Sequence, residues 1–68
     1  MKLGDLIKVP SGRFTHFYRS IHAFPVAGRI NDDTLILVLD ESSGSIRNVA
    51  LSDGRVGYVN IIGLEVVG

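Results

Sequence analysis

Residues 52–67 read SDGRVGYVNIIGLEVV, and this stretch contains the clearest turn and strand pattern in the chain. Asp53-Gly54 is a strong hairpin signal, because these residue types accept the backbone angles of a tight two-residue turn. The residues that follow predict a strand over residues 55–60, a tight turn, and a short last strand over residues 64–67. The end of the chain therefore predicts β-structure.

Three more strands are predicted toward the N-terminus. Residues 34–40 (TLILVLD) are a continuous apolar run between turn signals, which is typical of a strand buried on both faces. Residues 45–52 form the expected return strand, and residues 3–9 a short first strand that Pro10 ends, since proline has no amide hydrogen. We expect an all-β fold of five short strands with one long first connection over residues 10–29. Closure into a small barrel would hide the aliphatic surface and shorten the exposed edges.

The chain has 68 residues, of which 46% are hydrophobic and 21% charged, and it is expected to form one globular domain over residues 1–68. A domain of this size buries only about 60% of the surface that its unfolded chain exposes, so its stability margin is small. Because the chain has no cysteine, it can form neither a disulfide nor a cysteine-ligated zinc site. A well-packed core or a partner subunit is left to supply stability.

The net charge of zero conceals an uneven distribution. Residues 1–30 contain five basic residues and one acid, whereas residues 31–68 contain two basic residues and six acids. Such a dipolar chain can meet an acidic partner at its basic end or pair with itself. Because no apolar run is long enough to span a bilayer and no signal peptide is recognisable, we expect a soluble cytoplasmic protein.

Residues 13–24, RFTHFYRSIHAF, hold all three phenylalanines and both histidines of the chain and no acid. Phe14, Phe17, Tyr18 and Ile21 have the spacing of one helix face, but an extended loop fits the segment as well. We expect the aromatic rings to point mainly inward and the polar side chains outward, where they can touch a partner. The candidate binding residues are Arg13, His16, Tyr18, Arg19 and His22, together with Tyr58 and Asn60 near the C-terminus.

Catalysis and metal binding are not expected. The serines lie in turns, and a barrel of this size offers little volume for a substrate pocket. His16 and His22 are six residues apart, which matches neither the helical nor the strand spacing of a metal pair. The pairs Asp32-Asp33 and Asp40-Glu41 are explained by a turn and by a strand end, where charges discourage aggregation. We therefore expect no enzyme, no metal, no cofactor and no small-molecule substrate.

The C-terminal stretch resembles the end of an SH3-like barrel. Gly57-Tyr58-Val59 matches the glycine-aromatic-aliphatic strand of that family, and Asn60 to Gly63 the single helical turn before its closing strand. The opening GDLIKV (residues 4–9) matches the first strand, which gives residues 10–29 the place of the long RT-type loop. The whole chain is similar to small SH3-like proteins of tailed, especially marine, bacteriophages. The resemblance implies a phage-encoded protein in the cytoplasm of the host cell.

Two departures from the family concern proline-peptide recognition. The chain has no tryptophan for the aromatic groove, and Asn60-Ile61-Ile62-Gly63 stands where the family has Pro-Ser-Asn-Tyr. Proline-peptide recognition is therefore not expected. We expect a non-catalytic protein-binding or assembly module whose partner is a host protein, a phage protein or a second copy. The alternative is a nucleic-acid- or ribosome-associated barrel, in which Tyr18 stacks on a base. Its phosphate contacts would come from Lys8, Arg13, Arg19 and Arg29.

Overall fold

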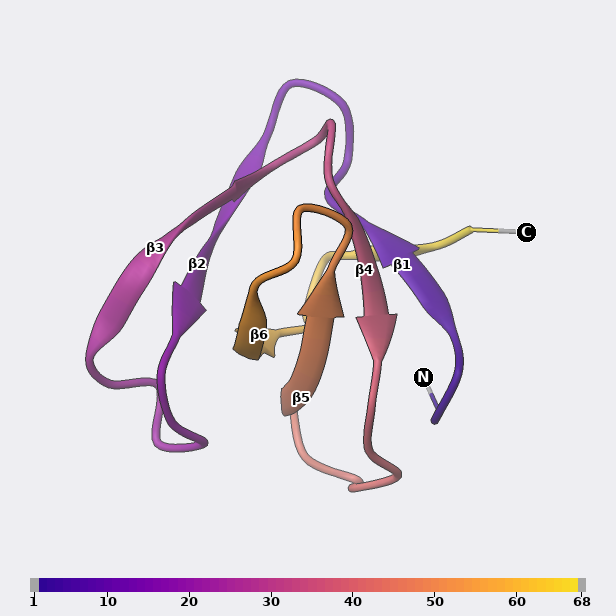
Figure 1. Ribbon diagram of the computed structural model, residues 1–68. Helices are drawn as coiled ribbons and strands as arrows, with labels where there is room; N and C mark the ends of the chain where they lie inside the picture. Colours follow the sequence, from indigo (N-terminus) through magenta and orange to yellow (C-terminus); the bar gives the residue numbers. More distant parts are fainter. Residues whose placement is uncertain (1, 68) are drawn as a thin grey trace.

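A computed structural model describes residues 2–67 and shows one antiparallel sheet of seven strands, with no helix in that range (Figure 1). The prediction of an all-β fold is confirmed. The order of the strands across the sheet is β3-β2-β6-β5-β4-β1-β7. Their bounds are β1 Leu6–Lys8, β2 Phe14–Tyr18, β3 Val26–Asn31, β4 Leu35–Val38, β5 Ile46–Leu51, β6 Val56–Asn60 and β7 Glu65–Val66.

The prediction of five strands closed into a barrel is wrong. Residues 10–29 are not a long loop, because Phe14–Tyr18 and Val26–Asn31 pair with each other as the β2–β3 hairpin. This hairpin joins the sheet through β2 and β6, and in Figure 1 it stands at the left, with β6 next to it and β5 and β4 beyond. In the described part of the chain β3 and β7 are the two edges, so the sheet curls without closing.

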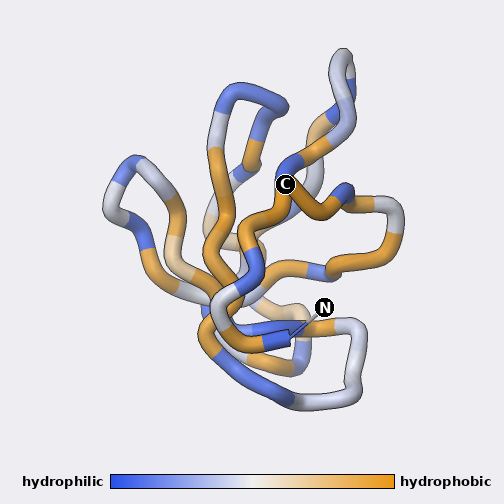
Figure 2. Tube along the Cα trace, turned by 90° about the vertical axis from the view of Figure 1, so that its right-hand side faces the viewer, coloured by the Kyte–Doolittle hydropathy of each residue, from blue (hydrophilic) through white to orange (hydrophobic). Residues whose placement is uncertain are grey.

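The core lies on the inner face of the curled sheet. It consists of buried aliphatic side chains and one phenylalanine, with Ile61 and Leu64 packed against them: Ile7, Val9, Phe17, Ile30, Ile36, Val38, Val49, Leu51 and Val59. These side chains come from alternate positions of the strands, as the pleat requires. Figure 2 shows hydrophobic residues along the strands and hydrophilic residues in several of the projecting loops.

The prediction that the apolar run at residues 34–40 is buried on both faces is wrong. Ile36 and Val38 are fully buried, whereas Leu35 and Leu37 are 42% and 37% exposed. The reason is that the described chain forms a single sheet, and no second layer of it covers the outer side of β4. A strand of this composition therefore leaves an apolar outer face in contact with solvent.

The two turns of the C-terminal stretch had different outcomes. The Asp53-Gly54 hairpin is confirmed, and the Gly54 amide donates to the Leu51 carbonyl at 2.9 Å. The predicted helical turn after Asn60 is wrong. The Leu64 amide donates to the Ile61 carbonyl at 3.1 Å across a β-turn in which Gly63 has a φ of +83°. A glycine in this left-handed region is typical of a type II turn, which leads directly into β7.

A close backbone approach at Gly57 fixes β2 against β6. A Cβ atom at this position would lie 2.5 Å from the Phe17 ring and 2.7 Å from the Tyr18 carbonyl oxygen. Only glycine allows this approach without displacing the neighbouring strand. The glycine of the strand motif therefore positions β2, and with it the aromatic side chains of the first hairpin.

Candidate binding surface

A row of aliphatic side chains crosses the outer face of the sheet. Leu6 of β1 lies opposite Leu37 of β4, Leu37 opposite Ala50 of β5, and Ala50 opposite Val56 of β6. Leu6, Leu37 and Val56 are 41%, 37% and 64% exposed. The leucine surface, as the term is used below, consists of Leu6, Leu35, Leu37, Ala50 and Val56. Because cross-strand partners share one face of a sheet, the row is continuous over four strands.

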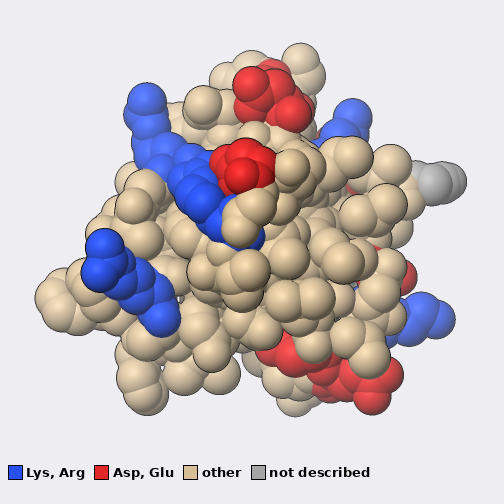
Figure 3. Space-filling model, viewed as in Figure 1, with Lys and Arg blue, Asp and Glu red and all other residues tan. Residues whose placement is uncertain are grey.

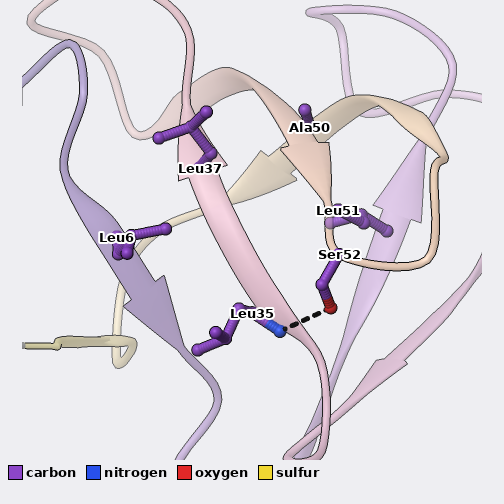
Figure 4. Close-up of a pocket in the computed structure, with 6 residues that line it drawn as sticks. All are labelled: Leu6, Leu35, Leu37, Ala50, Leu51 and Ser52. Atoms are coloured by element: carbon purple, nitrogen blue, oxygen red, sulfur yellow. Dashed lines mark hydrogen bonds between the residues drawn. The ribbon is translucent and has the colours of Figure 1, made fainter.

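The leucine surface contains a shallow hollow of about 250 Å³ (Figure 4). Its lining is aliphatic apart from Ser52, and consists of Leu6, Leu35, Leu37, Ala50, Leu51 and Ser52. The Ser52 hydroxyl oxygen accepts a hydrogen bond from the Leu35 amide at 3.1 Å, and the Ser52 amide donates to the Leu35 carbonyl at 2.9 Å. A pocket for a drug-sized ligand has roughly 300–1,000 Å³. The hollow therefore suits an apolar side chain.

A second feature of the outer face is a row of rings on β2. Phe14, His16 and Tyr18 occupy alternate positions of this strand, and Tyr18 lies opposite Tyr58 of β6. The ring centroids of Phe14 and His16 are 5.7 Å apart, and those of His16 and Tyr18 are 6.5 Å apart. These four residues are called the aromatic row below. The interplanar angles of 77° and 52° mean that these neighbouring rings are not stacked face to face.

The surroundings of the aromatic row are basic. The guanidinium of Arg29 lies over the Phe14 ring at 4.5 Å from its centroid, and Arg29 is the cross-strand partner of His16. Arg13 directly precedes Phe14 and is exposed, and residues 6–31 contain no acid. Figure 3 shows basic side chains at its left, over the side of the molecule that β2 and β3 form. The first hairpin therefore presents rings and cations together.

Arg55 differs from Arg13 and Arg29, because it forms an ion pair with Asp53. Its guanidinium lies 2.8 Å from the Asp53 carboxylate and 5.4 Å from the centroid of the Phe17 ring. The hydrogen bond from the Arg55 side chain holds the pKa of Asp53 below its ordinary value. This ion pair belongs to the turn between β5 and β6, so Arg55 supplies little net charge to a partner.

The structure brings three of the predicted binding residues together. His16, Tyr18 and Tyr58 share the aromatic row, with both tyrosines half-buried. Arg19 and His22 are exposed in the turn between β2 and β3, beyond the end of the row. Asn60 is half-buried, and its side-chain oxygen accepts a hydrogen bond from the Ile62 amide at 2.9 Å. Asn60 therefore has a structural task in the C-terminal turn.

The prediction that the aromatic rings of residues 13–24 point inward is correct for Phe17 alone among the phenylalanines. Phe17 is buried, whereas Phe14 is 51% and Phe24 is 74% exposed. Phe14–Tyr18 of this segment form a strand rather than a helix, so the pleat sends Phe14 and Phe17 to opposite faces. Phe24 lies in the turn that precedes β3, where no element of the described chain covers it.

Sequence reasoning missed the leucine surface and the role of Asp40. The carboxylate of Asp40 accepts from the Arg47 Nε at 2.8 Å and from the Asn48 amide at 2.9 Å. Arg47 is 2% exposed and belongs to the inner face of β5. A lone arginine at an inward position of an otherwise apolar strand is a signal that could have found this pair, because buried arginine needs an acid.

Within residues 2–67 no group of three histidine, cysteine or acidic side chains lies close enough to hold a metal ion, and no helix is long and apolar enough to cross a membrane. No protein-family model, curated protein or solved structure matches the chain.

Proposed function

We propose that this protein is a non-catalytic assembly module, and that the leucine surface packs against the same surface of a second copy. The observation that carries the proposal is the continuous row from Leu6 to Val56 across four strands. An antiparallel sheet ordinarily has one apolar face and one polar face, whereas this sheet is apolar on both sides at its centre. Two such faces can pack about 10 Å apart, as in β-sandwiches.

The leucine surface is suited to pairing with itself. It has a hollow beside Leu37, and it has a projecting side chain in Val56, which is 64% exposed. Two copies related by a twofold axis can therefore each place an apolar side chain in the hollow of the other. Twofold dimers are the commonest soluble oligomers. A second copy would also add buried apolar surface to the small core that a chain of this length can form.

The test is the oligomeric state in solution, measured by sedimentation equilibrium. We expect a dimer for the natural chain and a monomer for Leu37→Asp and Val56→Asp, because each places an unpaired carboxylate in the contact. The matched control is Ile62→Asp, since Ile62 is 75% exposed and lies outside the leucine surface. A natural chain that stays monomeric at high concentration, or an equal response of all three variants, would contradict the proposal.

The relation to SH3-like domains belongs to the same proposal. It is supported by the order of the last elements, in which Gly57-Tyr58-Val59 of β6 is followed by a tight turn and the short strand β7. It is also supported by the place of the β2–β3 hairpin, which fills the long connection between β1 and β4. A phage or host protein is the alternative occupant of the leucine surface, and a monomeric natural chain would favour it.

A further inference from the structure

The aromatic row adjoins the leucine surface on β6, where Val56 and Tyr58 share one face, and it is not explained by core packing. Phe14 is 51% exposed, His16 is exposed, and Tyr18 and Tyr58 are half-buried on the outer face. The inward residue of the same strand, Phe17, supplies the ring that the core needs. A strand of five residues thus places three further rings on its outer side, where they stabilise the core little.

The geometry of the rings leaves faces open to a ligand. Neighbouring rings along β2 meet edge to face or at a tilt, with centroids 5.7 and 6.5 Å apart. One face of Phe14 is covered by the guanidinium of Arg29, which is itself a planar group on which a base can stack. The Tyr18–Tyr58 pair extends the row from β2 onto β6. The outcome is a row of planar groups across two paired strands.

The charge beside the row is positive. Arg13 precedes Phe14 in the sequence, and the Arg29 guanidinium lies over the Phe14 ring. Arg19 follows Tyr18 directly. No acidic residue lies within residues 6–31, and Asp32, which follows them in the sequence, accepts a hydrogen bond from the Gly12 amide at 2.7 Å. A ligand that lies along β2 therefore meets rings on the sheet and cations at both ends of the strand.

We propose that the aromatic row binds single-stranded nucleic acid, with bases stacked on its rings and phosphates beside Arg13, Arg19 and Arg29. Stacking platforms flanked by cations are the usual means of binding single strands without sequence preference. A duplex keeps its bases paired and their faces covered, so it cannot use the rings. An acidic peptide would use the arginines alone and would gain nothing from rings at every second residue.

The chain provides its own reporter for this proposal. It has no tryptophan and two tyrosines, Tyr18 and Tyr58, and both belong to the aromatic row. Stacking of a base on either tyrosine should quench the intrinsic fluorescence of the protein. The probes are unlabelled oligothymidylate and oligouridylate of about 8 nucleotides, a length within the site size of small barrels that bind single strands. A duplex of the same length and a polyglutamate peptide are the comparison ligands.

Affinity is then measured by the anisotropy of the same oligonucleotides carrying a terminal dye. We expect Tyr18→Ser and Phe14→Ser each to weaken binding about tenfold or more, and Tyr18→Phe to keep it, because phenylalanine retains the stacking ring. The matched control for ring removal is Phe24→Ser, since Phe24 is 74% exposed and lies outside the row. Circular dichroism checks that each variant keeps the fold.

The contribution of the cations is tested by the dependence of affinity on salt. Removing one phosphate contact from a single strand should reduce the slope of log K against log salt by about 0.7. We expect this change for Arg29→Gln and for Arg13→Gln. It should be absent for Lys8→Gln, which removes the same charge from β1, where Lys8 lies 4.0 Å from Glu65. Leu37→Asp should bind the oligonucleotides as the natural chain does, because it alters only the leucine surface.

Three results would overturn the proposal. The first is absence of quenching and of anisotropy change with either oligonucleotide at low salt. The second is binding that Phe24→Ser weakens as much as Tyr18→Ser, or Lys8→Gln as much as Arg29→Gln. The third is binding of polyglutamate or duplex as tight as that of the single strands, which would assign the surface to an acidic protein or to charge alone.

Discussion

At the scale of single residues, Gly57 shows how one missing side chain sets the position of a functional strand. The ring of Phe17 and the carbonyl of Tyr18 occupy the space where a Cβ atom would stand. The Phe17 ring belongs to the core on the inner face of β2, and the Tyr18 ring belongs to the aromatic row on its outer face. The same glycine therefore serves the core and the aromatic row.

We expect Gly57→Ala to destabilise the protein by about 1–3 kcal/mol, because the added methyl group must displace a ring and a backbone carbonyl. The matched control is Gly44→Ala, since a Cβ atom at Gly44 would meet nothing within 4 Å. The free energy of unfolding in urea measures both effects. An equal change in the free energy of unfolding of the two variants would show that β2 can move away from β6 with little loss of stability.

The ion pair of Asp53 and Arg55 predicts a pH dependence with a definite sign. The hydrogen bond from Arg55 lowers the pKa of Asp53 below its ordinary value of 3.8 in the folded chain. A lowered folded-state pKa means that the stabilisation is present at neutral pH and is lost as the pH falls below 3.8 through the lowered pKa. We expect an NMR titration to place the Asp53 carboxyl below its ordinary pKa and Arg55→Gln to raise this pKa toward the ordinary value, since the variant keeps only the backbone hydrogen bond of residue 55. An unchanged titration in the variant would remove Arg55 as the cause.

At the scale of elements, the segment that joins β4 to β5 is held by a charge. Asp40 follows β4, and its carboxylate bonds both the Arg47 side chain and the Asn48 amide on β5. Arg47 is almost fully buried, so its guanidinium depends on partners within the protein rather than on water. Asp40, which follows β4, therefore helps to hold the β4–β5 hairpin together.

We expect Asp40→Asn to lower the free energy of unfolding by about 2 kcal/mol, because it weakens charge-assisted hydrogen bonds to a buried guanidinium. Glu41→Gln removes the same charge from the exposed neighbouring residue and should change stability by less than about 0.5 kcal/mol. Urea unfolding at neutral pH compares the two variants. A loss of the same size in both would point to net charge rather than to the contact with Arg47.

The elements also show where sequence reasoning succeeds and where it fails. Asp53-Gly54 predicts its hairpin correctly, because a turn depends on local backbone preference. Phe14, Phe17 and Tyr18 mislead, because their spacing fits a helix face as well as a strand, and partners distant in sequence decide between the two. The opposition of Tyr18 and Tyr58 has no local signal at all. It arises from the pairing of β2 with β6, which are separated by more than half of the chain.

At the scale of the whole molecule, the outer face of one sheet carries two surfaces of different chemistry. The leucine surface lies over β1, β4, β5 and β6, and the aromatic row lies over β2 and β6. The apolar composition of residues 34–40 predicts burial on both faces, which is correct for Ile36 and Val38 and wrong for Leu35 and Leu37, because no second layer of the described chain covers the outer side of β4. Variants of Leu37 and of Tyr18 should therefore separate assembly from ligand binding in one protein.

The junction between the β2–β3 hairpin and the rest of the sheet has a mechanical consequence. In residues 2–67, the strand pairing at this junction consists of Phe17 opposite Val59 and Tyr18 opposite Tyr58. This seam is the line at which the hairpin meets the rest of the sheet, and Phe17 and Ile30 of the hairpin also pack in the shared core. The aromatic row crosses that line, with Phe14 and His16 on one side and Tyr58 on the other. A ligand that bridges the row would connect the two sides of this line, and its binding is expected to restrain the hairpin against β6.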